Sequence, residues 1–194
     1  MRPPLDAVEF LLSETDPGKL PACAAEVAFV GRSNVGKSTL LNAVCRKNLA
    51  RVSNTPGRTR TINVFAAGPD RRLVDLPGYG YAAGPAAERE SWAAMIEGYL
   101  TNRPSLRMVY ALIDAKVGPT KLDLHMLNWL ESRQLDWRAV ATKADQIKRS
   151  RADAQQREIA QAAGLNPEEL AWVSADTGFG IGALRTEINT VLAA

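Results

Sequence analysis

Cysteine is scarce in this sequence, and long apolar runs are absent. Only two cysteines, Cys23 and Cys45, occur among the 194 residues, too few for a disulfide framework and without the spacing of a metal site. The longest apolar stretch is about the length of Met108 to Ile113, far short of the roughly 20 residues that a membrane-spanning helix needs. These features exclude a disulfide scaffold, a cysteine-based metal centre and a transmembrane helix.

Targeting signals are also lacking. The N-terminal MRPPLDAVEF has no charged start followed by an apolar stretch, and the C-terminal NTVLAA has no cysteine for prenylation. We therefore expect a cytoplasmic protein. The hydrophobic share of 46% and the charged share of 23% are those of an ordinary globular protein and exclude wholesale disorder. The length favours one domain over residues 21–194, with 1–20 as an appended segment, and we expect a monomer.

Charge is distributed unevenly along the chain. The net charge is +3 overall, but residues 19–72 hold ten Lys and Arg against two acids, a net charge of +8. Such a split suggests that this region faces a polyanion, either a phosphate ligand or a nucleic-acid backbone, although a solvated basic face explains it about equally well.

Short apolar runs alternate with helix-length amphipathic segments, a pattern typical of an α/β sheet. The expected strands cover 26–30, 61–67, 72–75, 107–114, 137–142 and 171–174. The expected helices cover 37–46, 86–99, 121–132, 151–163 and 181–192. Only GPDR separates the second and third strands, so one antiparallel strand is expected in an otherwise parallel sheet of six strands.

The first expected strand leads directly into a phosphate-binding motif. The run Gly31-Arg32-Ser33-Asn34-Val35-Gly36-Lys37-Ser38 fits G-x-x-x-x-G-K-[ST] and opens a helix. Its glycines let backbone N–H groups surround phosphates, and the helix dipole favours the negative charge. Lys37 is expected to reach the β- and γ-phosphates, and Ser38 to offer Mg²⁺ a hydroxyl. The motif and its neighbours predict a three-layer α/β/α fold of the P-loop NTPase type.

Two further loops complete the predicted phosphate side. Asp75-Leu76-Pro77-Gly78 places an acid at a strand's carboxyl end and a glycine three residues later, an arrangement suited to a metal-bound water and to a backbone N–H that contacts the γ-phosphate. The loop 54–61, rich in hydroxyls and arginines, offers Thr59 as the second Mg²⁺ hydroxyl. We assign Lys37, Thr59 and Gly78 to catalysis.

The identity of the base is predicted from two later loops. In Thr142-Lys143-Ala144-Asp145 the carboxylate can accept from both the ring N–H and the amine of guanine, while the Lys143 stem lies over the ring. In Val173-Ser174-Ala175 the last N–H can donate to the guanine carbonyl. These loops favour guanine over adenine.

Five motifs in this order resemble those of the translation-factor-related GTPases and, within them, of the EngB family. The marks are GRSNVGKSTLLNAV, NTPGRTRTINVF, LVDLPGYGYA and TKAD; Thr142 stands where the wider GTPase motif has Asn. By this resemblance the metal ligands fall on Ser38 and Thr59. The nucleotide contacts fall on Gly31, Arg32, Ser33, Asn34, Val35, Gly36, Lys37, Ser38, Gly57, Arg58, Thr59, Arg60, Thr61, Asp75, Leu76, Pro77, Gly78, Thr142, Lys143, Ala144, Asp145, Val173, Ser174 and Ala175.

The resemblance also implies a biological role. Members of the EngB family are cytoplasmic GTPases needed to assemble the large ribosomal subunit, and their depletion disturbs cell division and septation. The ribosomal subunit, through its RNA and proteins, is the implied partner. Asn34 matches an asparagine with which related GTPases hold K⁺, which makes potassium a further candidate ligand.

Three alternatives remain at this stage. A small-molecule kinase or ATPase shares the phosphate loop, but Asp145 argues against it. A membrane-traffic switch lacks its lipidation signal here. A binding module with negligible hydrolysis stays open, because Tyr79 stands where signalling GTPases place a water-orienting Gln. We expect Tyr79 to anchor its loop in the core and hydrolysis to be slow.

Overall fold

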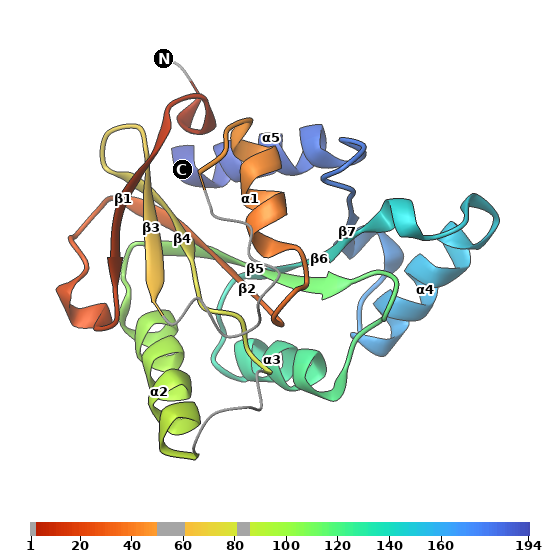
Figure 1. Cartoon of the computed structure of the whole chain (residues 1–194), viewed down its shortest axis with the longest axis horizontal. Coiled ribbons are helices and arrows are strands. Elements are labelled where there is room, and N and C mark those ends of the chain that lie inside the picture. The colour runs from red at the N-terminus through yellow and green to blue at the C-terminus, as the bar shows by residue number, and fades with distance from the viewer. Residues whose placement is uncertain (1–2, 50–60, 81–85) are drawn as a thin grey trace.

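A seven-stranded sheet lies between two layers of helices (Figure 1). The computed structural model describes residues 3–49, 61–80 and 86–194, with the side chains of 86–92 left out of the description. The strands are β1 Val8–Glu14, β2 Ala25–Gly31, β3 Ile62–Ala67, β4 Arg71–Asp75, β5 Leu106–Asp114, β6 Trp137–Thr142 and β7 Leu170–Trp172. The helices are α1 Lys37–Cys45, α2 Ala86–Asn102, α3 Lys121–Ser132, α4 Ala152–Ala162 and α5 Ile181–Ala193.

The strands follow the order β1-β3-β4-β2-β5-β6-β7. Strand β3 runs antiparallel to both of its neighbours, β1 and β4, whereas the pairs from β4 through β7 are parallel. The three-layer fold with a single reversed strand is thus confirmed.

The sheet has one strand more than the six expected, because β1 lies within the N-terminal residues taken as an appended segment. Its sequence VEFLLSE lacks clean alternation, and the register with β3 shifts between Phe10 and Leu12. Phe10 and Leu11 are exposed. A bulged edge strand gives a weak periodic signal, and its pairing partner lies about fifty residues along the chain.

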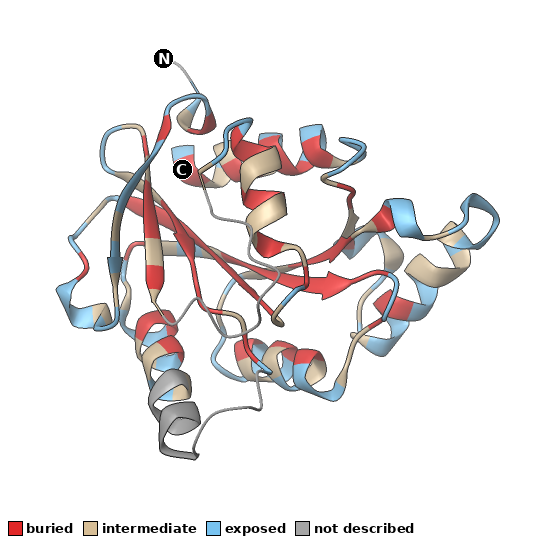
Figure 2. Cartoon of the chain, in the orientation of Figure 1, coloured by how far each residue is buried: buried red, intermediate tan, exposed pale blue. Residues whose placement is uncertain are grey.

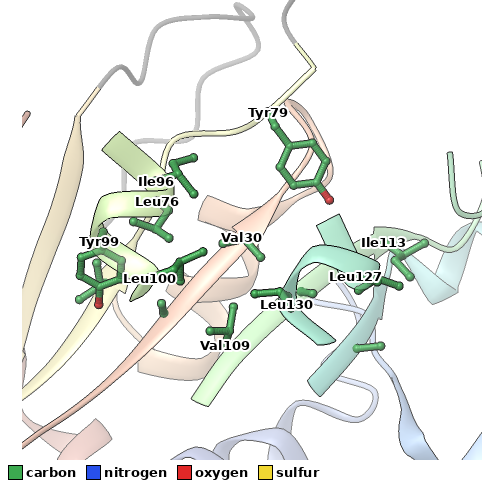
Figure 3. Close-up of a cluster of buried hydrophobic side chains, with 14 of the residues drawn as sticks. Val30, Leu76, Tyr79, Ile96, Tyr99, Leu100, Val109, Ile113, Leu127 and Leu130 are labelled. Atoms are coloured by element: carbon green, nitrogen blue, oxygen red, sulfur yellow. The ribbon is translucent and has the colours of Figure 1, made fainter. Parts of the chain in front are cut away.

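The two faces of the sheet carry separate cores. Helices α1 and α5 cover one face with Leu41, Val44, Leu184 and Ile188, while α2, α3 and α4 cover the other. Figure 2 shows the buried positions running along the central strands, and Figure 3 shows part of the second core. All seven residues of β2 are buried, as is typical of a parallel strand covered on both faces. No helix in the described ranges combines the length and apolarity of a membrane span.

The parallel strands deliver their carboxyl ends to one edge of the sheet. The loops after β2, β4, β6 and β7 therefore meet there, and ligands of open α/β sheets bind at this edge. At the start of β2, in contrast, the buried Glu26 pairs with Arg103, whose Nε lies 2.7 Å from Oε1. The expected binding loops and this ion pair thus lie at opposite ends of the same strand.

Candidate nucleotide-binding site

The loop between β2 and α1 contains two residues with a left-handed backbone conformation. Asn34 and Gly36 have φ angles of 66° and 96°. A Cβ on Gly31 would lie 2.8 Å from Cγ1 of Val35, so the tight start of the loop requires glycine there. Helix α1 begins without a side-chain cap. Its first N–H groups are donors suited to a phosphate.

Lys37 and Asp75 connect this loop to the end of β4. The Lys37 ammonium is ion-paired with Oδ1 of Asp75, and both side chains are more than nine-tenths buried. Ser38 follows Lys37 and is half-buried. One cation and two oxygen-bearing side chains are thus brought to the position that the sequence predicts for the phosphates and their metal.

The turn after β4 is hydrogen-bonded to the phosphate loop by backbone groups. The N–H of Tyr79 donates to the Gly31 carbonyl at 3.1 Å, and the N–H of Ser33 donates to the Tyr79 carbonyl at 3.0 Å. A Cβ on Gly78 would lie 3.0 Å from the Ser33 nitrogen. Leu76 and Pro77 are buried beside it. A side chain at Gly78 would therefore require the phosphate loop to shift by a few tenths of an ångström.

The side chain of Tyr79 is buried in the core that α2, α3 and α4 cover. Its hydroxyl donates to Oδ1 of Asp123 at 2.9 Å. Burial raises the pKa of the Tyr79 phenol well above its usual value, and the Asp123 carboxylate raises it further. The phenol stays protonated and engaged, so the prediction of an anchor is confirmed.

The loop after β6 contacts both the phosphate loop and the end of β5. The Thr142 hydroxyl donates to the Val35 carbonyl at 2.6 Å. Lys143 Nζ donates to the Asn34 carbonyl at 2.7 Å and to Oδ2 of Asp114 at 2.6 Å. Thr142 thus connects the loop after β6 to the phosphate loop, although it lacks the side-chain amide of the Asn found in the wider GTPase motif.

Asp145, the residue predicted to bind the base, is hydrogen-bonded to the loop after β7. Ser174 Oγ donates to Oδ1 of Asp145 at 2.6 Å, and the Ala144 N–H donates to the Val173 carbonyl at 3.1 Å. Asp145 itself is exposed, and Ala175 is half-buried. An oriented, accessible carboxylate is the group that can accept from a guanine edge.

The predicted loop that carries Thr59 lies almost wholly outside the described residues. Gly57, Arg58, Thr59 and Arg60 lie outside the described residues, as do residues 81–84 after the Gly78 turn. Thr61 is described, but its contact is local: its hydroxyl lies 3.4 Å from Oδ1 of Asn63.

Two carboxylates near the site were not predicted. Asp114 is the last residue of β5 and orients Lys143; Asp123 is in the first turn of α3 and holds Tyr79. An acid at the carboxyl end of a parallel strand is the signal that could have identified Asp114. For Asp123 the sequence shows only the capping pair Thr120 and Asp123.

Comparison with known proteins identifies the family. A family model described as "50S ribosome-binding GTPase" matches residues 26–143. A "Probable GTP-binding protein EngB" from Pelotomaculum thermopropionicum is 47% identical over 175 residues, covering 89% of this chain and 88% of that protein. The chain belongs to the EngB family of GTP-binding proteins. A relative of the same name from Cereibacter sphaeroides is 45% identical over 88% of this chain and 81% of its own length.

Solved structures agree on the fold. The crystal structure of a probable EngB GTP-binding protein superposes with a TM-score of 0.71 at 23% identity, covering 87% of this chain and 99% of that one. Era in complex with MgGDPNP and nucleotides 1506–1542 of 16S ribosomal RNA gives a TM-score of 0.69 at 23% identity, covering 89% and 58%. This EngB-family chain therefore has the P-loop GTPase fold, and guanine nucleotides are its expected ligands.

Proposed function

We propose that this chain binds GTP and GDP at the edge formed by the loops after β2, β4, β6 and β7 and hydrolyses GTP to GDP and phosphate. The observation that carries the proposal is the buried Lys37–Asp75 pair beside the uncapped start of α1. The α1 N–H groups and Lys37 would hold the phosphates, the Gly78 N–H would contact the γ-phosphate, and Asp145 would read the base. Equilibrium binding of fluorescent GDP, competed by GTP or ATP, tests this site. ATP competing as well as GTP would contradict it.

The donor set at the phosphate side fits Mg²⁺. Ser38 offers a hydroxyl, and Asp75, which Lys37 places beside the same loop, offers a carboxylate; Mg²⁺ prefers such hard oxygen ligands and keeps several waters. We assign Ser38 and Thr59 as the protein ligands, with Asp75 holding a metal-bound water. The ion, when bound, neutralises charge on the β- and γ-phosphates. EDTA should therefore weaken nucleotide binding, which a titration of Mg²⁺ into the stripped protein measures.

Hydrolysis should be slow. The Tyr79 phenol donates to Asp123 within the core, so it does not supply the water-orienting group that signalling GTPases place after the glycine. Single-turnover release of phosphate measures the rate. The contact between Tyr79 and Asp123 also favours the alternative, a nucleotide-gated binding module with negligible hydrolysis. This alternative predicts that wild type releases phosphate no faster than the Lys37→Ala variant.

The partner we propose is the large ribosomal subunit, with a role in its assembly and, through it, in cell division and septation in the cytoplasm. The proposal is supported by the ribosome-binding description of the family model and by the charge of +8 over residues 19–72. Sedimentation of the protein with ribosomal subunits under GTP, GDP and no nucleotide tests it. We expect association to be strongest with GTP and to fall with salt as phosphate contacts are lost.

Asn34 is the proposed contact for a potassium ion. It is exposed on the phosphate loop with a left-handed backbone. Hydrolysis should then be faster in potassium than in sodium salts. Equal rates would leave Asn34 as a structural residue of the turn.

A further inference from the structure

Three separate segments meet at the carboxylate of Asp123. Oδ1 accepts from the Tyr79 hydroxyl at 2.9 Å. Oδ2 accepts from the Thr120 N–H at 2.8 Å and from the Thr120 hydroxyl at 2.7 Å, and lies 3.5 Å from Nε of Arg32. The residue is 1% exposed. The start of α3, the turn after Gly78 and the phosphate loop are therefore joined at one buried group.

Capping the helix accounts for only half of these contacts. The Thr120–Asp123 capping box uses Oδ2 and the Asp123 N–H, which is sufficient to begin α3. Oδ1 is left to bind Tyr79, and Figure 3 shows the Tyr79 hydroxyl pointing toward the helix that carries Leu127 and Leu130. A buried carboxylate needs such partners because an unpaired charge there is costly.

Tyr79 transmits this contact to the turn. It directly follows Gly78, and its backbone N–H and carbonyl both bond to the phosphate loop, at Gly31 and Ser33. The ring, fixed at its far end by Asp123, leaves the preceding peptide little freedom. A Cβ on Gly80, one residue further, would lie 3.0 Å from Cδ1 of Leu122 and 3.3 Å from Cγ of Arg32. Directly after Gly78, Tyr79 is thus held at its backbone by the phosphate loop and at its ring by Asp123.

We propose that Tyr79 and Asp123 are positioning residues that hold the Gly78 N–H where it contacts the γ-phosphate of GTP. The inference rests on the proposed function, since it requires that Gly78 reads the γ-phosphate. Neither side chain touches the nucleotide; both act through the Gly78 peptide. Because GDP lacks the γ-phosphate, the two residues favour GTP over GDP.

Tyr79→Phe is the sharpest variant, because it removes one hydroxyl and leaves the ring in the core. The hydrogen bond to a charged acceptor corresponds to about tenfold or more in an equilibrium, so we expect the ratio of GTP to GDP affinity to fall about tenfold with GDP affinity nearly unchanged. Tyr110→Phe is the matched control: Tyr110 is fully buried, stacks on Phe29 and lies against the other face of the sheet. It should leave the ratio unchanged.

Asp123→Asn is the second variant and decides the matter if Tyr79→Phe does not fold. It keeps the size of the side chain but replaces one acceptor oxygen with a donor and removes the charge facing Arg32. We expect the same fall in the ratio. A ratio within about twofold of wild type in either folded variant overturns the proposal. Failure of the wild-type protein to bind GDP would instead contradict the nucleotide site itself.

Discussion

The hydroxyl of Ser174 lies 2.6 Å from Oδ1 of Asp145, the two residues being 29 positions apart in the chain. The bond fixes the carboxylate from the side of the β7 loop, and the Ser174 Oγ in turn accepts from the Thr177 N–H at 3.1 Å. The carboxylate expected to read the base is therefore held before any ligand arrives.

Asp145→Asn should change the base preference. An amide in place of the carboxylate can donate to the ring carbonyl of xanthine but cannot accept two bonds from guanine. We expect GDP affinity to fall about a hundredfold and XDP affinity to rise, because a polar site rejects a mismatched partner strongly. Competition titrations with the two diphosphates measure this. Unchanged GDP affinity would remove Asp145 from the base site.

Asp114→Asn should weaken the binding of GDP, IDP and XDP to the same extent. The amide still accepts from the Lys116 N–H, which Asp114 Oδ1 caps at 2.9 Å, but it loses the charge that holds Lys143. Since Lys143 lies over the ring in our proposal, we expect GDP, IDP and XDP affinities to fall by about tenfold without a change in selectivity. A selective loss for GDP would show that Asp114 acts on base recognition instead.

Glu26→Gln should lower stability without affecting the site. The Glu26 carboxylate pairs with Arg103 and is 1% exposed, at the end of β2 remote from the nucleotide loops. The variant leaves the Arg103 guanidinium, whose side chain is 11% exposed, with a neutral amide and the Leu20 and Pro21 carbonyls as acceptors, so we expect a loss of about 2 kcal/mol. Urea unfolding measures this loss, and the GDP affinity of the folded variant should equal that of wild type. Weaker GDP binding would mean that the two ends of β2 are coupled.

The phosphate loop and the central strands could be predicted from the sequence because their signals are local. Gly31 to Ser38 is a contiguous motif, and β6 was bounded correctly by its apolar run alone. Helix α3 covers the predicted range 121–132, and the structure shows a capping box of Thr120 and Asp123 at its start.

Strand β1 and the roles of Asp114 and Asp123 could not be predicted, because they depend on contacts between distant segments of the chain. Strand β1 is defined by its pairing with β3, and its bulge removes the alternation that would mark it. The role of Asp114 depends on Lys143, 29 residues away, and that of Asp123 on Tyr79, 44 residues away. The only local signals are the place of Asp114 at the carboxyl end of β5 and the capping box of Asp123, and neither names the distant partner.

The two proposed metal ligands should differ in their effects. Ser38 follows Lys37 on α1 and would hold Mg²⁺ with either nucleotide, so Ser38→Ala should weaken GTP and GDP binding together. Thr59 would join only when its loop closes over the γ-phosphate, so Thr59→Ala should lower GTP affinity alone. Titrations of both nucleotides with and without Mg²⁺ measure the difference. An unchanged ratio of GTP to GDP affinity in Thr59→Ala would remove it from the site.

Ionisation of the Cys45 thiol should lower the free energy of unfolding at high pH. Burial raises the pKa of its thiol to about 12, outweighing the Arg185 and Lys47 charges that lower it. In the unfolded chain the thiol ionises near its ordinary pKa of 9.0. Between these values the unfolded state loses its proton and the folded state keeps it, so the contribution is fully present below pH 9 and is lost as pH rises toward 12. The measurement is the free energy of unfolding of wild type minus that of Cys45→Ala, which cancels other groups titrating in that range. A difference independent of pH would contradict the prediction.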